Sequence, residues 1–125
     1  MDGKQSGYQI MRELMGDKYM EARDGKITPF NSVLHEYIEE VCFGRVWSRE
    51  GIDRKLRSIL NVALLTALNR PNQLRNHIDG AINNGCTVDE LREVLLHAAV
   101  YAGLPAAVDS FRIAEEVLLA RGAID

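Results

Sequence analysis

The sequence predicts an all-α protein of about six helices. Apolar residues recur at the three- and four-residue spacing of helices along most of the 125-residue chain. Proline and glycine lie at the ends of these periodic segments, where they start or stop helices. No stretch alternates apolar and polar residues between hairpin signals, so we predict no β-sheet. Because the chain has no linker and no repeat, we expect a single domain over residues 1–125.

We expect the first helix over residues 4–15, with Gly16 as its stop. Residues 17–26 show no clear pattern. The second helix is predicted to begin at Thr28-Pro29, with threonine as the N-cap, and to end at Gly44. Its apolar stripe is expected to consist of Phe30, Val33, Leu34, Tyr37, Ile38 and Val41.

The third helix is predicted over residues 53–69. It is apolar on nearly every face after Arg57, so we expect it to be the buried central helix. Pro71 blocks its continuation and opens a fourth helix, which Asn83-Asn84-Gly85 terminates. The apolar stripe of the fourth helix is Leu74, Ile78, Ala81 and Ile82.

Thr87 and Glu90 have the spacing of a capping box and predict the start of a fifth helix, which ends at Gly103. Pro105 starts the sixth helix, whose apolar surface is wide enough to bury a second face against another subunit. The expected core residues of these two helices are Leu91, Val94, Leu95, Ala98, Ala102, Ala107, Phe111, Ile113, Ala114, Val117 and Leu118.

The composition limits the possible partners and compartments. The longest apolar run, residues 59–68, is too short to span a bilayer, and the N-terminus lacks the pattern of a secretory signal, so we expect a cytoplasmic protein with no membrane partner. A net charge of −3 argues against nucleic-acid binding. Cys42 and Cys86 form neither a CxxC pair nor a zinc spacing, and we expect free thiols.

The charge is unevenly distributed. Residues 45–75 carry seven cations against Glu50 and Asp53 only. A small anionic ligand is the natural inference from such a basic segment, although for most of these side chains a solvated helix face is the better interpretation.

Three histidines offer proton-transfer chemistry. His77 lies at the border of the fourth helix's apolar stripe, where it could serve as a general acid or base, although its position alone favours a structural histidine. His97 shares a helix face with Glu93 and Tyr101, which fits a polar or interface patch better than an acid/base cluster, and His35 is interpreted as structural. We predict no metal site and no nucleotide or other cofactor, since ligand triads and glycine-rich phosphate loops are missing.

Several motifs together resemble the carboxymuconolactone decarboxylase family, in matching order and spacing. They are residues 44–58 (GRVWSREGIDRKLRS), 75–78 (RNHI), 83–91 (NNGCTVDEL) and 101–107 (YAGLPAA). The resemblance covers roughly residues 44–117 closely. It implies an AhpD-like helical fold that assembles into a homo-oligomeric ring, a trimer or a hexamer.

The redox relatives in this superfamily use a glutamate, a CxxC pair and a histidine. With His77 as that histidine, the corresponding positions here are Ser58, Arg70 and Gln73. Without these thiols we expect no peroxide reduction by that route, and a thiol peroxidase would need Cys42 and Cys86 to meet.

The resemblance therefore implies the decarboxylase branch, which acts on 4-carboxymuconolactone in protocatechuate catabolism and needs no cofactor. In this interpretation His77 is the general acid, Arg54 and Arg57 grip the carboxylates of the anionic lactone, Trp47 forms a pocket wall and Arg70 adds an anion contact. Two alternatives stay open: a related enzyme acting on another small acid or lactone, and a non-catalytic helical oligomer that binds a small anion or a partner.

Overall fold

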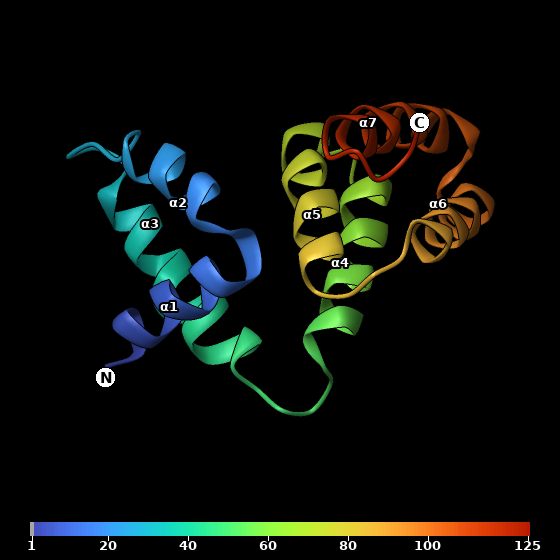
Figure 1. The fold of residues 1–125 in the computed structure, drawn as a ribbon. Coiled ribbons are helices and arrows are strands. Elements are labelled where there is room, and N and C mark those ends of the chain that lie inside the picture. The colour runs from blue at the N-terminus through green and yellow to red at the C-terminus, as the bar shows by residue number, and fades with distance from the viewer. Residues whose placement is uncertain (1) are drawn as a thin grey trace. The chain divides into compact units, whose positions relative to one another are not determined.

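The computed structural model describes residues 2–125, whose helices form two compact units, Met1–Asp53 and Arg54–Asp125 (Figure 1). All regular elements within residues 2–125 are helical, which confirms the all-α prediction. These residues contain seven α-helices and one π-helix. The number exceeds the expected one because residues 17–24 are helical and because the predicted second helix is divided into two elements.

The first unit begins with α1 (Gly3–Met15), which ends at Gly16 as predicted. Asp2 caps this helix: its carboxylate accepts a hydrogen bond from the Gln5 backbone N–H at 2.8 Å, and the Gln5 side chain accepts one from the Asp2 N–H. Gly16 has a φ of +91°, a conformation that favours glycine. Helix α2 (Asp17–Asp24) follows directly, in the segment that shows no clear sequence pattern.

The predicted second helix is wrong at both ends. Thr28-Pro29 lies before the helix, because Thr28 and Asn31 hold each other in a turn in which each backbone N–H donates to the other's side chain, at 2.7 and 3.2 Å. The structure has instead α3 (Ser32–Tyr37), followed without a break by the π-helix η1 (Ile38–Trp47). The chain stays helical through Gly44 and leaves the helix only after Trp47.

The apolar stripe expected for this segment is largely exposed. Phe30, Val33, Leu34 and Tyr37 leave most of their surface uncovered. In the wider turns of η1 the buried residues are instead Glu39, Phe43 and Trp47, spaced four apart. The core of the first unit consists of Met11, Leu14, Met15, Met20, Phe43 and Trp47.

Helices α1 and η1 approach each other through two glycines. A Cβ at Gly7 would overlap the carbonyl oxygen of Glu39, and a Cβ at Gly44 would overlap the carbonyl oxygen of Gly3. Because every other residue carries a Cβ, this backbone-to-backbone approach requires glycine at both positions.

The first unit also buries an ion pair. Nη2 of Arg23 lies 2.6 Å from Oε2 of Glu39, and the two side chains are only 6% and 8% exposed. Arg23 also binds Asp24 at 3.0 Å and the His35 carbonyl at 3.3 Å. Although burial works against its charge, the hydrogen bonds to Glu39 and Asp24 hold the pKa of Arg23 above its usual value.

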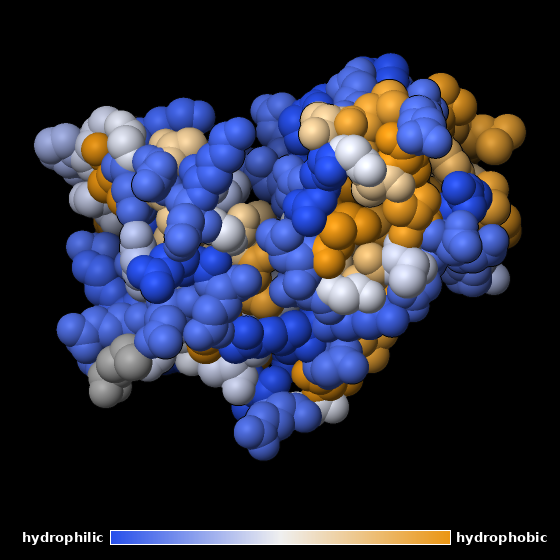
Figure 2. Space-filling view, viewed as in Figure 1, coloured by the Kyte–Doolittle hydropathy of each residue, from blue (hydrophilic) through white to orange (hydrophobic). Residues whose placement is uncertain are grey.

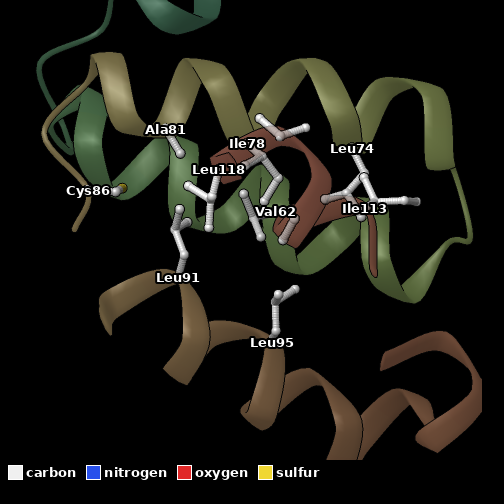
Figure 3. Close-up of a cluster of buried hydrophobic side chains, with 11 residues drawn as sticks. Val62, Leu74, Ile78, Ala81, Cys86, Leu91, Leu95, Ile113 and Leu118 are labelled. Carbon is white, nitrogen blue, oxygen red and sulfur yellow. The ribbon is translucent and has the colours of Figure 1, made fainter. Parts of the chain in front are cut away.

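The second unit contains α4 (Arg54–Ala67), α5 (Pro71–Asn83), α6 (Val88–Ala102) and α7 (Leu104–Ala120). The predicted proline starts, the Thr87–Glu90 capping box and the end at Gly103 are confirmed. All four helices contribute to one apolar core, drawn in Figure 3. Its buried members are Val62, Leu74, Ile78, Ala81, Cys86, Leu91, Leu95, Ile113, Ala114, Val117 and Leu118.

The third helix is central to its unit as predicted, because α4 packs against α5, α6 and α7, but the expectation that it is buried holds for only part of its surface. Helix α4 buries one stripe, Ser58, Val62 and Thr66, against the other helices. A second stripe of leucines, again spaced four apart, is 42% to 60% exposed: Leu56, Leu60, Leu64 and Leu68. Ala102, expected in the core of α6, is exposed as well. Hydrophobic residues gather on the visible face of this unit in Figure 2.

Candidate active site

The site forms on two consecutive helices of the second unit, α4 and α5, which a tight turn joins. Asn69 takes a left-handed conformation with φ +57°, which asparagine tolerates, and the Arg70 N–H donates to the Leu65 carbonyl at 3.0 Å. Pro71 then begins α5. The two helices therefore pack against each other as an antiparallel hairpin.

His77 lies on α5 where it faces α4. Its Nδ1 is 3.4 Å from Nδ2 of Asn61. Asn61 and His77 stand about two helical turns from the Asn69–Arg70 turn, one on each helix, and this equal spacing brings them level. The ring is half-buried, and burial lowers the pKa of His77 below its usual value because it disfavours the charged imidazolium.

Two of the predicted arginines share the helix face of Asn61. Arg57 precedes Asn61 by four residues and Arg54 precedes it by seven, so all three lie along one side of α4. Arg57 is half-buried with its Nε atom covered, and Arg54 is exposed at the start of the helix. Two guanidinium groups therefore lie on the helix that contacts the histidine.

Arg70 lies on the opposite side of His77 along the hairpin. It is exposed in the turn, roughly 10 Å along α5 from His77, whereas Arg57 lies roughly 6 Å beyond Asn61 in the other direction. The structure therefore does not group Arg70 with Arg54 and Arg57. Its role as an anion contact stays a prediction.

Trp47 belongs to the first unit. Its ring is 7% exposed and stacks on Phe43 at a centroid distance of 5.8 Å. It also forms a hydrogen bond with Cys42, whose pKa burial raises. Trp47 is thus a core residue of its own unit, and its role as a pocket wall stays a prediction.

Of the three positions that would hold redox groups, Ser58 has a structural partner instead. Ser58 is buried and accepts a hydrogen bond from Nδ2 of Asn84 at 2.8 Å, which ties α4 to the end of α5. Gln73 is exposed. Cys86 is buried in the apolar core with its thiol 3.8 Å from the Lys55 carbonyl, and both cysteines are free. Within residues 2–125 no cluster of His, Cys, Asp and Glu could hold a metal ion.

The other two histidines lie away from His77 along the chain. His97 is exposed on α6 with its ring 5.0 Å from that of Tyr101, and both line an apolar groove of about 420 Å³ between α4 and α6. His35 is in the first unit, where its carbonyl binds Arg23. Across residues 2–125 no helix is long and apolar enough to cross a bilayer.

Sequence reasoning missed Asn61. Its side chain interrupts an otherwise apolar run, and it lies eight residues before Asn69, while His77 lies seven residues after Arg70. Counting helical turns in both directions from the Asn69–Arg70 turn would have placed it level with the histidine.

Comparison with known proteins relates the chain to decarboxylases. Residues 33–116 match the model of the carboxymuconolactone decarboxylase family. The chain is 40% identical to a 4-carboxymuconolactone decarboxylase of Acinetobacter baylyi, over 89% of the chain and 83% of that protein. It is 38% identical to a nitrosuccinic acid decarboxylase of Metarhizium robertsii, over 90% of the chain and 78% of that protein. A 15.0 kDa uncharacterized protein of Paracoccus denitrificans is 36% identical over 62% of the chain and 60% of its own length.

Proposed function

The chain belongs to the carboxymuconolactone decarboxylase family, and we propose that it converts 4-carboxymuconolactone into 3-oxoadipate enol-lactone in protocatechuate catabolism. The observation that carries this proposal is its similarity, along most of both chains, to the Acinetobacter baylyi enzyme of that name. The half-buried His77 and the two arginines on the facing helix support it, since they suit an anionic substrate that must be protonated. A cytoplasmic location is part of the proposal.

The chemistry needs an electron sink and a proton donor. When the bond to the ring carboxylate breaks, carbon dioxide leaves, and its electron pair moves through the ring alkene into the lactone carbonyl. The resulting dienolate takes up a proton on carbon to give the enol-lactone. Because the substrate supplies its own sink, the protein has to bind the dianion, stabilise the developing negative charge and deliver the proton.

In our proposal His77 delivers that proton. Burial keeps its ring neutral in the free protein at neutral pH, because it lowers the pKa. A bound dianion favours the imidazolium, so substrate binding raises the pKa of His77. The ring then becomes protonated and donates this proton to the dienolate. Arg54 and Arg57 hold the carboxylates, since guanidinium groups bind them bidentately.

The test is decarboxylation of 4-carboxymuconolactone, followed by carbon dioxide release and enol-lactone formation. We expect His77→Gln to lower kcat by about 100- to 10,000-fold, the usual contribution of a general acid. Arg57→Ala should chiefly raise KM, and Arg92→Ala is the matched control, because Arg92 is exposed on α6 and binds Asp89. Full activity of His77→Gln would overturn the assignment of the acid.

A second substrate is favoured by the similarity to the nitrosuccinic acid decarboxylase. In nitrosuccinate the nitro group can accept the electron pair that decarboxylation releases, so the same arginines and the same acid would serve. Rates with both substrates at equal protein concentration decide between them. If kcat/KM is higher for nitrosuccinate than for 4-carboxymuconolactone, nitrosuccinate is the preferred substrate and the first proposal is wrong.

We also propose that the partner of the exposed apolar face is a second copy of the chain, in a trimer or hexamer. The exposed leucine stripe of α4 and the apolar groove beside it form one apolar face, and such faces mark sites of interaction with other proteins. Sedimentation should show an oligomer that Leu64→Lys weakens, whereas Gln9→Lys, at an exposed position of α1, leaves it intact. A wild-type monomer would contradict this assembly.

A further inference from the structure

Asn61 is the residue whose side chain approaches a ring nitrogen of His77. The two side chains come from different helices, and Nδ2 of Asn61 lies 3.4 Å from Nδ1. Since Nδ1 is occupied in this way, Nε2 is the ring nitrogen left to meet a ligand. We propose that Asn61 is a positioning residue, which binds Nδ1 of His77 and so presents Nε2 as the atom that delivers the proton. The catalytic consequence rests on the proposed function, whereas the ring geometry does not.

An uncharged amide suits both states of the ring. When His77 is neutral, the Asn61 amide N–H donates to Nδ1, which places the ring proton on Nε2. When the ring becomes an imidazolium, the same amide can turn and accept the Nδ1–H with its oxygen. Asn61 therefore keeps the ring in one orientation before and after protonation. A carboxylate in its place would instead stabilise the imidazolium permanently.

The charged groups on the packed helices are already engaged or lie to one side. On α5, Arg75 binds Glu116 of α7 at 2.7 Å and Asp79 binds Arg121 of α7 at 3.1 Å. On α4, Lys55 binds Glu90 of α6 at 2.8 Å, and Arg54 and Arg57 lie along the face of Asn61 on the side away from the turn. The group that contacts Nδ1 is a neutral amide. In our proposal the negative charge that favours the imidazolium comes from the bound substrate.

Two substitutions at Asn61 test the proposal in the intact protein. Asn61→Leu keeps a similar volume without the amide, and we expect kcat to fall about 10- to 100-fold with little change in KM, because the ring loses its orientation. Asn61→Asp should raise the pH at which His77 titrates by about one unit or more. Asn72→Leu, on an exposed position of α5, is the matched control.

Heteronuclear NMR of the histidine ring nitrogens gives a readout in the absence of substrate. At a pH above its pKa, His77 should carry its proton on Nε2 in the wild type, and Asn61→Leu should change this tautomer signal. A proton on Nδ1, a titration unmoved by Asn61→Asp, or an unchanged kcat in Asn61→Leu would overturn the proposal. If the ring behaves as expected while neither substrate is decarboxylated, the proposed function fails and the positioning role stands.

Discussion

Replacing Arg23 by alanine should strongly destabilise the first unit. Its partner Glu39 is 8% exposed in the side chain and lies 2.6 Å from the guanidinium. Arg23→Ala would leave this carboxylate buried without its counter-ion, and breaking a buried pair in this way costs about 3–5 kcal/mol of unfolding free energy. That is a large fraction of the roughly 5–15 kcal/mol typical of a whole domain.

Urea unfolding followed by tryptophan fluorescence measures the loss of unfolding free energy in the first unit. Trp47 is the single tryptophan of the chain and is buried in the same unit. Arg12→Ala is the control, because Arg12 and Asp17 form an exposed pair at 3.3 Å that should contribute at most about 1 kcal/mol. The double replacement Arg23→Met with Glu39→Leu should recover much of the loss, since it removes both buried charges. A loss below about 1 kcal/mol in Arg23→Ala, or no recovery in the double variant, would refute the reasoning.

Three further predictions concern stability. Gly7→Ala should cost about 3 kcal/mol or more in denaturant unfolding, because its Cβ overlaps the Glu39 backbone, while Gly3→Ala should be tolerated. Leu74→Ala, at a position 1% exposed, should cost about 2–5 kcal/mol, and a smaller loss would contradict its core position. His77 has a lowered pKa when folded, so the unfolded chain binds the proton more readily: the free energy of unfolding should rise with pH up to about 6.5 and fall as the pH drops below it. His77→Gln should flatten this dependence in melts across that range.

In the second unit, signals from neighbouring residues were sufficient to predict where helices start and stop. Helix starts at Pro71 and Thr87 and the stop at Gly103 depend on neighbouring residues only, so the sequence pattern predicted them correctly. The segment after Thr28 was different. There the Asn31 turn moved the start of the helix to Ser32, and the buried residues of η1, among them Phe43 and Trp47, are not members of the predicted apolar stripe.

For the candidate site, the sequence predicted the residue types but not their grouping. His77 and Arg57 do lie on adjacent helices. Arg70 is not grouped with Arg54 and Arg57, because the turn places it on the other side of the histidine. Trp47 packs within the core of the first unit. Asn61 was missed because its importance depends on the residue that faces it across the hairpin, and not on any motif around it in the sequence.

The glycine contact between α1 and η1 bears on how this protein can be shortened. The segment that matches the family begins at residue 33, so it includes η1 but omits α1. A protein trimmed to that segment would lose the helix that packs on Phe43 and Trp47. It would also expose to water the backbone at Gly44, which α1 contacts closely. For expression and crystallisation, the useful N-terminal boundary therefore lies before Asp2, well ahead of the region by which the family is recognised.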